Sequence, residues 1–225
     1  MFDPYPEGLE HCTRCPRLAE HRQAVAHKKR RAYQGEDYWG KPVPGFGDPD
    51  ARILLLGLAP GAHGSNRTGR MFTGDGSGNF LFPALHRTGF ASQPNATGRG
   101  DDLTLQGVWI SAACRCVPPG NKPTRQEVLT CQGWLAHDID GLANLKLVLA
   151  LGSIAHDSYL ELLKARGQTV VKARYRFAHH TLHEIEGALP MLDSYHVSIQ
   201  NTNTGKLTPE MFDAVLERAK AVAFL

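Results

Sequence analysis

Three apolar runs stand out along the chain, each stopped by glycine, proline or charged residues. Residues 51–61 (ARILLLGLAPG) are almost continuously apolar, and residues 103–117 (LTLQGVWISAACRCV) and 145–152 (LKLVLALG) repeat the pattern. A short apolar run bounded by turn residues is typical of a strand buried on both faces of a sheet. We therefore predict three buried strands, followed by a fourth, shorter strand at residues 193–196.

Helical periodicity fills the intervals between these runs. We predict helices at about residues 78–88, 124–137 and 153–164, an earlier helix at 16–32, and a last helix after Thr208. Thr124 and Glu127 have the spacing of a capping box, and Thr208 followed by Pro209 is typical of a helix start. The last helix carries one apolar stripe, which consists of Phe212, Val215, Leu216, Ala219 and Val222.

Strands that alternate with helices indicate an α/β fold with a mostly parallel sheet and helices on both faces. We find no internal repeat, no low-complexity segment and no linker, so we expect one domain over residues 1–225. Such a sheet binds its ligand at the carboxyl ends of its strands. The loops after Leu56, Val117, Leu151 and Tyr195 are therefore the candidates for a functional site.

Composition narrows the class of protein. Of the 225 residues, 42% are hydrophobic and 21% are charged, as in ordinary folded proteins. The longest strongly apolar run, residues 145–151, is far too short to cross a bilayer, and the start of the chain lacks the apolar stretch of a signal peptide. We expect a cytoplasmic protein with no membrane association. The net charge of +3 says little about partners.

Five cysteines in such a chain do not indicate a disulfide framework. Cys12 and Cys15 form a C-x-x-C pair, Cys114 and Cys116 flank one arginine, and Cys131 follows. Four thiolates can hold a metal ion or an iron–sulfur cluster that ties the first 50 residues to the middle of the chain. The alternative is a set of buried free thiols.

Three of the candidate loops carry unusual chemistry. Residues 57–80 are rich in glycine, which lets backbone N–H groups approach a ligand, and Asp75 is the only acid between Asp50 and Asp101. Phe72 in this loop is either a core residue or a stacking surface. Residues 116–125 (CVPPGNKPTR) combine prolines with cations and suit phosphate contact, or they form a plain helix entry. Residues 194–208 place His196 before a polar loop.

The segments GLAPGAHGSNRTGRMFTGD, ISAACRCVPPGNKPT, LVLALG and YHVSIQNTNTGKLT together resemble the type b, family 5 uracil-DNA glycosylases of bacteria and archaea. The resemblance runs in order from Cys12 to about Thr208 and into the last helix. It implies a three-layer α/β/α sandwich with a central, mainly parallel four-stranded sheet. It also implies a monofunctional DNA glycosylase that flips and excises uracil, and further deaminated bases such as hypoxanthine and xanthine, in base excision repair.

The resemblance assigns roles residue by residue. It implies a [4Fe–4S] cluster on Cys12, Cys15, Cys116 and Cys131, with Cys114 as a surplus thiol. It implies catalytic roles for Asp75, Asn121 and His196. The base would be held by Gly57, Ala59, Pro60, Gly61, Ala62, His63, Phe72, Asn121 and His196. DNA would be contacted by Arg67, Arg70, Lys122, Ser198, Gln200, Asn201, Asn203, Thr204 and Lys206.

Three residues depart from the family patterns, and each departure predicts a change in the loop or in base selectivity. Val197 replaces the usual proline after His196, which predicts a less rigid loop. Ala112 stands where the uracil-specific type a relatives have an asparagine that reads the base, and Gly64 replaces their acidic residue. Loss of a polar reader predicts broader base selectivity.

The expected partner is double-stranded DNA that contains deaminated bases, with single-stranded DNA as a further substrate, and the expected state is a monomer. Two alternatives remain open. One is a non-catalytic iron–sulfur or zinc DNA-binding protein, for which Asp75 would be dispensable. The other is a uracil-specific type a glycosylase.

Overall fold

The computed structural model describes residue 3 and residues 5–224, and its centre is one sheet of six strands. The strands lie in the order β1-β3-β2-β4-β6-β5. Their bounds are β1 Phe46–Gly47, β2 Ile53–Gly57, β3 Val108–Ala112, β4 Leu147–Leu151, β5 Leu182–His183 and β6 Met191–Ser194.

The four central strands β3, β2, β4 and β6 run parallel to one another. The expectation of a mainly parallel four-stranded sheet is confirmed for this centre. The sheet is wider than expected, because β1 pairs antiparallel with β3 at one edge and β5 pairs antiparallel with β6 at the other. Each edge strand is two residues long, too short to leave a period-2 pattern in the sequence.

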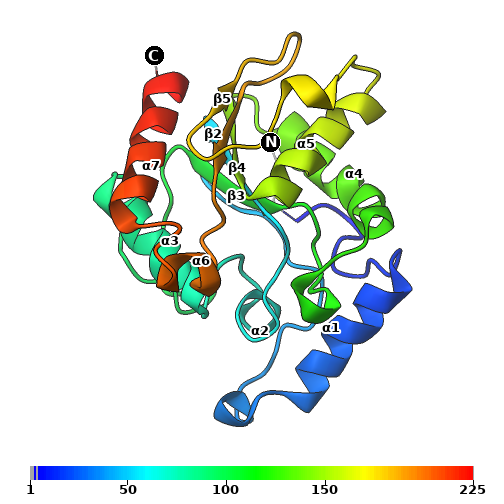
Figure 1. The fold of residues 1–225 in the computed structure, drawn as a ribbon. Coiled ribbons are helices and arrows are strands. Elements are labelled where there is room, and N and C mark those ends of the chain that lie inside the picture. The colour runs from blue at the N-terminus through cyan, green and yellow to red at the C-terminus, as the bar shows by residue number, and fades with distance from the viewer. Residues whose placement is uncertain (1–2, 4, 225) are drawn as a thin grey trace.

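Helices cover both faces of the sheet and complete the three layers (Figure 1). Helices α3 (Gly76–Arg87) and α7 (Pro209–Ala223) pack against the face that presents Ile53 and Leu55, and α4 (Arg125–Gly141) and α5 (Ser153–Ala165) pack against the face that presents Leu54 and Leu56. Every residue of β2, β3, β4 and β6 is buried. Burial of both faces explains the continuous apolar runs.

The predicted helix starts are confirmed in their side-chain geometry. The Thr124 hydroxyl accepts the Glu127 N–H, and the Glu127 carboxylate accepts the Thr124 N–H, which is a complete capping box at the start of α4. Thr208 caps α7 by accepting the Met211 N–H. Of the apolar stripe on α7, Phe212, Val215, Leu216 and Ala219 are buried and Val222 is partly buried.

The N-terminal segment packs along the lower end of the molecule in Figure 1. Helix α1 (Pro16–Lys28) ends earlier than predicted, because Lys29 adopts a positive φ of 50° and breaks the helical path. The Arg17 guanidinium donates to the Glu127 carboxylate at 2.6 and 2.7 Å, and the Trp39 N–H donates to the Arg67 carbonyl at 2.8 Å. The segment therefore contacts both α4 and the glycine-rich loop.

Short helices lie in the connecting segments. They are α2 (Ser65–Thr68), α6 (Ile199–Asn203) and the 3-10 turns Arg31–Tyr33, Pro119–Asn121 and Lys172–Arg174. In Figure 1, α2 and α6 lie at the same lower end as α1. Across the described part of the chain, no helix has the length and apolar character needed to cross a bilayer.

Candidate active site and cysteine pocket

Four loops leave the sheet at one edge, because the four central strands are parallel. β2 ends at Gly57, β3 at Ala112, β4 at Leu151 and β6 at Ser194. β3 and β4 lie on opposite sides of β2, so the order of the strands reverses there. Ligands bind at such a reversal in open α/β sheets. The glycine-rich loop after β2 and His196 after β6 are therefore brought to the same edge.

Asp75 stands at the start of α3, and its two carboxylate oxygens have different surroundings. Oδ1 accepts the N–H groups of Ser77 and Gly78 at 3.0 and 3.1 Å, so it caps the helix. Oδ2 faces the backbone of Gly61 and Gly64, since a Cβ on Gly64 would lie 2.0 Å from it. Among the described contacts, Oδ2 takes no part in the cap. One carboxylate thus serves the helix and also points into the glycine-rich loop.

Burial raises the pKa of Asp75 above its ordinary value, while the two cap hydrogen bonds and the charge of Arg67 act in the opposite direction. Raised carboxyl pKa values are common where a carboxylate is placed for chemistry. Because Gly61 and Gly64 lack side chains, Oδ2 can approach the backbone of the glycine-rich loop closely. The geometry suits stabilisation of a positive charge by a partly desolvated carboxylate.

Phe72 lies in the same glycine-rich loop as Asp75 and is only 9% exposed. Its ring reaches Gly57, the last residue of β2, where a Cβ would come within 2.7 Å of the ring. Phe72 also has a positive φ of 53°, which is a strained conformation for a bulky residue. The structure thus makes Phe72 largely a core residue, with its ring near the candidate site. Its stacking on a base stays a prediction.

His196 follows β6 and lies next to Phe72 and Gly152. Its ring centroid lies 6.2 Å from that of Phe72, and its Cβ would contact a Cβ placed on Gly152 at 3.2 Å. Burial lowers the pKa of His196 to about 4. The imidazole is therefore neutral at physiological pH, and it can donate one hydrogen bond without carrying charge.

The loop after His196 is anchored although it lacks the family's proline. The Val197 side chain is fully buried in the core. The Asn201 amide donates to the His196 carbonyl at 2.8 Å, and Ser198 caps α6 by accepting the Asn201 N–H. These contacts restrain the backbone at His196, as a proline ring would do in the family pattern. The predicted loss of rigidity is thus countered by side chains that sequence reasoning had assigned to DNA.

His63 lies in the same glycine-rich loop and is held by the N-terminal segment. The Tyr38 hydroxyl lies 2.9 Å from His63 Nδ1 and accepts the Arg30 N–H. Burial and the nearby cations Arg30 and Arg67 lower the pKa of His63. A neutral His63 can accept the Tyr38 proton at Nδ1, which leaves its second nitrogen as the donor. The contribution of Tyr38 was missed, because nothing in the sequence links residue 38 to this loop.

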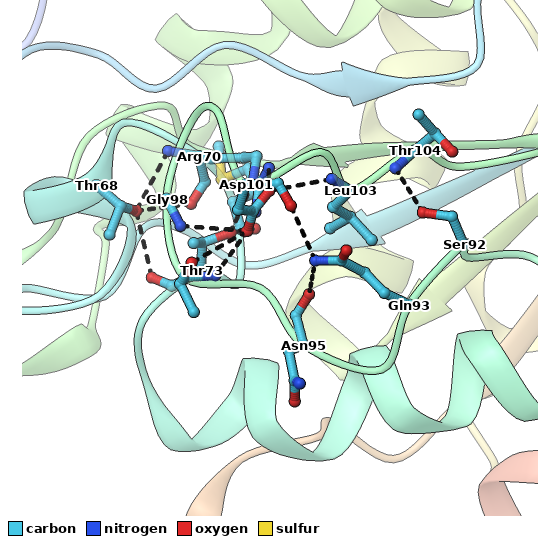
Figure 2. A network of polar contacts seen from close by, with 12 residues as sticks. Thr68, Arg70, Thr73, Ser92, Gln93, Asn95, Gly98, Asp101, Leu103 and Thr104 are labelled. Atoms are coloured by element: carbon cyan, nitrogen blue, oxygen red, sulfur yellow. Dashed lines mark hydrogen bonds and ion pairs between the residues drawn. The ribbon is translucent and has the colours of Figure 1, made fainter.

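Arg70 is not placed to contact DNA, and the prediction that it does is not supported. Its guanidinium donates to both Asp101 oxygens at 2.6 and 2.8 Å and is almost fully buried. Figure 2 shows this pair at the centre of a network that includes Thr68, Thr73 and Gln93. The hydrogen bonds and charge that surround Asp101 hold its carboxyl pKa well below the ordinary range, against the effect of burial. Arg70 fastens the glycine-rich loop to residues 93–103.

Arg67 is also engaged within the protein. It pairs with Glu36, and it donates to the carbonyls of His63 at 2.7 Å and Gly74 at 3.1 Å. Its guanidinium closes the loop that surrounds Asp75. A phosphate contact by Arg67 would require Glu36 to give way, so we interpret this residue as part of the loop's own framework.

The remaining DNA candidates fall into two groups, one with exposed side chains and one with side chains bonded within the protein. Lys122, Gln200, Asn203 and Lys206 have exposed side chains, while Ser198, Asn201 and Thr204 bond to their own loop. Two arginines at the ends of the proline-containing segment 116–125 are also engaged within the protein. Arg115, just before it, pairs with Asp138 in the interior, and Arg125, its last residue, pairs with Glu161. Sequence reasoning also missed Ile199, an apolar side chain that is 53% exposed at the start of α6.

Asn121 lies apart from Asp75 in the described contacts. It is exposed on the turn Pro119–Asn121, and its N–H donates to Pro118. Gly120 and Asn121 both have a positive φ, of 60° and 58°, a conformation that these two residue types tolerate. The catalytic and base-binding roles predicted for Asn121 stay predictions.

The four cysteines expected to hold a cluster line one small pocket. Cys12 and Cys15 come from the N-terminal segment, Cys116 from the loop after β3, and Cys131 from α4. Cys114 is fully buried beside them and does not line the pocket. The grouping of four sulfurs from three segments far apart in the chain agrees with the expected ligand set.

The electrostatic surroundings of this pocket suit an anionic group. Arg14, Arg22 and Arg115 line it, and Arg22 Nη1 donates to Cys116 Sγ at 3.3 Å. Within the described residues, Arg115 Nε and Nη1 are buried without a hydrogen-bond partner. Burial raises the pKa of Cys116 to about 12, whereas a hydrogen bond from Cys114 lowers the pKa of Cys131. A bound cation would favour the Cys116 thiolate, and the arginines can balance the remaining negative charge.

The fold and the site together define an α/β/α enzyme that works at the carboxyl edge of its sheet. The Uracil DNA glycosylase superfamily matches residues 44–220, and the chain belongs to this superfamily.

Three relatives are similar over most of their length. A Type-5 uracil-DNA glycosylase of Thermus thermophilus is 49% identical over 223 residues, with 99% of each chain covered. One of Mycobacterium tuberculosis is 45% identical over 213 residues, which are 94% of this chain and 78% of that protein. One of Pyrobaculum aerophilum is 41% identical over 222 residues, with 99% and 93% covered. These findings agree with the family resemblance that the motifs indicated.

The geometry predicts that His196 does not titrate near neutrality. Because burial lowers its pKa to about 4, its ring-proton chemical shifts should stay constant between about pH 5 and pH 8. The resonance is assigned by its loss in His196→Asn. A sigmoidal shift centred near the ordinary histidine value of about 6.5 would show that His196 is charged in the folded protein.

Proposed function

We propose that this chain is a monofunctional DNA glycosylase that removes uracil, and further deaminated bases, by hydrolysis of the N-glycosidic bond. The observation that carries the proposal is the divided role of Asp75, whose Oδ1 caps α3 while Oδ2 lies close against the backbone of Gly61 and Gly64 in the glycine-rich loop. A cap alone does not require this second arrangement. The superfamily membership of the chain supports the same reaction class.

Cleavage of an N-glycosidic bond leaves positive charge on the sugar and negative charge on the departing base, as in other oxocarbenium-like reactions. Asp75 Oδ2 would stabilise the sugar cation and orient the attacking water. Its position is fixed before reaction by the helix cap, so little reorganisation is needed when the charge develops. The mechanism uses the ionised carboxylate; burial raises the pKa of Asp75, while the cap hydrogen bonds and the charge of Arg67 favour the ionised form.

The departing base needs a donor for its developing negative charge. His196 is neutral and carries a ring N–H, and its ring centroid lies 6.2 Å from that of Phe72. Backbone N–H groups of the Ala59–His63 loop would assist it. The lysines of these motifs, Lys122 and Lys206, are assigned to the DNA backbone and not to the sugar, so we expect no strand cleavage through a covalent sugar–enzyme intermediate.

The target base lies inside a duplex and must be flipped out of the stack before it reaches Asp75. The exposed side chains of Lys122, Gln200, Asn203 and Lys206 are available to the DNA backbone. Ile199 is an exposed apolar side chain that would fill the space left by the flipped base, as apolar wedges do in other complexes. We propose that the protein acts as a cytoplasmic monomer on duplex DNA, and also on single strands.

Broad base selectivity follows from the ends of β2 and β3. Gly57 and Ala112 are register partners at the carboxyl edge of the sheet, near Phe72. Neither has a side chain that can form a hydrogen bond, so the amide that reads uracil in type a relatives has no counterpart there. A site without a polar reader rejects other bases poorly.

We propose that Cys12, Cys15, Cys116 and Cys131 hold a [4Fe–4S] cluster. Their grouping around one pocket with three arginines supports this assignment. The cluster would supply a covalent tie between the N-terminal segment, the loop after β3 and α4. Through Ala59, which packs against Cys114 and Val128, this tie reaches the base-binding loop.

The two alternatives differ from this proposal in measurable ways. A non-catalytic iron–sulfur or zinc DNA-binding protein would bind DNA that contains uracil without releasing the base. A uracil-specific type a enzyme would release uracil and leave other deaminated bases in place. An excision assay on duplexes with single defined lesions distinguishes all three.

Asp75→Ala should lower single-turnover excision of uracil by about a hundredfold or more, because the carboxylate acts mainly in the transition state. DNA affinity should stay within a few-fold. Wild-type excision should also decline on acidification at a pH above the ordinary aspartate value of about 4, since burial raises the pKa of Asp75. A pH profile of single-turnover rates tests both statements.

The matched control is Thr208→Ala, which removes the cap of α7 and changes no residue assigned to catalysis or to base binding. Both variants lose a helix cap and should become less stable by about 1 kcal/mol. If the two variants lower excision equally, the carboxylate has only a structural role and the proposed mechanism is wrong.

The wild-type protein should release hypoxanthine from duplex DNA in addition to uracil, and the two release rates are compared under single-turnover conditions. Ala112→Asn should shift the ratio of the two rates toward uracil, because it restores a polar reader. Release of uracil alone by the wild-type protein would favour the type a alternative.

Protein prepared without oxygen should contain about four irons per chain and absorb near 400 nm, as expected for a [4Fe–4S] centre. Serine at Cys12, Cys15, Cys116 or Cys131 should abolish this absorbance, whereas Cys114→Ser should keep it. One zinc ion per chain with no iron would contradict the assignment.

A further inference from the structure

Three ionisable side chains meet in the interior at a place that takes no part in the site described above. His156 of α5, His183 of β5 and Asp193 of β6 are all buried. His156 Nδ1 lies 2.9 Å from Asp193 Oδ1, and His183 Nε2 lies 2.9 Å from Asp193 Oδ2. The Ala178 N–H also donates to Oδ2, at 3.2 Å.

Both ring nitrogens of His156 face oxygen atoms that accept hydrogen bonds. Nε2 lies 2.9 Å from the carbonyl oxygen of Tyr175, which has no proton to offer. Nε2 must therefore carry the proton of a neutral ring, which leaves Nδ1 with a lone pair directed at the Asp193 carboxylate. Two lone pairs at 2.9 Å repel each other, so a cation must lie between these two atoms.

The net charge of the three side chains indicates whether this cation is a proton or a metal ion. With both histidines neutral, the three side chains carry one negative charge, and one proton cancels it. A divalent metal ion would leave a net positive charge in the interior, where the described contacts of the cluster include no carboxylate besides Asp193. An uncompensated buried charge is strongly unfavourable. The 2.9 Å separations are also ordinary hydrogen-bond lengths.

The cluster holds the strand that presents His196. Asp193 lies three residues before His196, at the end of β6. His156 lies in the first turn of α5, where its N–H donates to the Gly152 carbonyl at 3.1 Å. The Gly152 N–H in turn donates to the Ser194 carbonyl at 2.8 Å, and Gly152 packs against His196. The start of α5 is therefore joined to the end of β6 by two hydrogen bonds, His156 to Asp193 and Gly152 to Ser194.

The neighbouring segment, residues 175–181, strengthens this attachment. The His180 N–H donates to the Asp193 carbonyl, and the Tyr195 N–H donates to His179 Nδ1. The rings of His179 and Tyr195 stack with centroids 4.6 Å apart. The ionisable groups around His156 are His183, whose ring centroid lies 5.3 Å away, Asp193, and Tyr175, whose ring lies against His183.

We propose that His156 is held as an imidazolium ion paired with Asp193, and that this buried pair is a positioning device that sets the location of His196. The functional part of the proposal depends on the proposed glycosylase activity, and the protonation state does not. Because the pair is shielded from solvent, its geometry is fixed, and loss of either partner would let the end of β6 move away from the site.

Nitrogen NMR tests the protonation state directly in the intact wild-type protein. Long-range ¹H–¹⁵N spectra of histidine-labelled protein at neutral pH should show both ring nitrogens of His156 protonated, with assignment by His156→Asn. An unprotonated Nδ1 would overturn the proposal. So would one metal ion per chain that is retained in a variant without Cys12 and Cys15 and lost in His183→Leu.

Kinetics test the positioning role. His156→Leu and Asp193→Asn should each lower single-turnover excision of uracil by about tenfold or more, because small displacements of a catalytic group are costly. Affinity for the same duplex should change by less than about threefold, since the DNA contacts lie elsewhere.

The matched control is Tyr159→Phe, which removes a buried hydrogen bond from α5 to the Leu189 carbonyl, remote from His196. It should lower the melting temperature and leave excision unchanged. If Tyr159→Phe and His156→Leu lower excision equally, the His156–Asp193 pair contributes only to the stability of the fold, and the positioning role is wrong. Absence of uracil excision by the wild-type protein would refute the proposed function, whereas the NMR result would still decide the state of His156.

Discussion

Burial of the parallel sheet on both faces is the constraint on which the rest of this structure depends. Strands β2, β3, β4 and β6 have no exposed residue, so they offer no place for solvated polar chemistry along their length. Functional side chains must therefore stand where the strands end. Because the strands are parallel, these ends share one edge, and the glycine-rich loop is brought toward His196 without any direct pairing in the sequence.

The same constraint explains why two buried arginines are paired with carboxylates. Arg70 is neutralised by Asp101, and Arg115 by Asp138, and each pair fastens a loop that follows a strand. Breaking one partner would leave an uncompensated charge in a medium of low polarity. Residues that look like phosphate ligands in the sequence are thus structural ties. The cations left for DNA are those, such as Lys122 and Lys206, whose side chains are exposed.

The site and the cysteine pocket share a common framework. Backbone N–H groups of Ala113 and Cys114 donate to the carbonyls of Gly57 and Leu58, so the loops after β2 and β3 are joined directly. The N-terminal segment contributes at both places, through Cys12 and Cys15 at the pocket and through Tyr38 at His63. A group bound by the four cysteines would therefore act on the shape of the base-binding loop from a distance.

The sequence by itself determined the α/β class, the parallel centre of the sheet, the caps at Thr124 and Thr208 and the grouping of four cysteines, because each depends on local periodicity, short-range spacing or a family motif. It could not determine the two-residue edge strands, the burial of Arg70, the contact of Tyr38 with His63 or the meeting of His156 with Asp193. Those depend on which distant segments pack together. A side chain's partner, and hence its charge and accessibility, is decided only when the chain has folded.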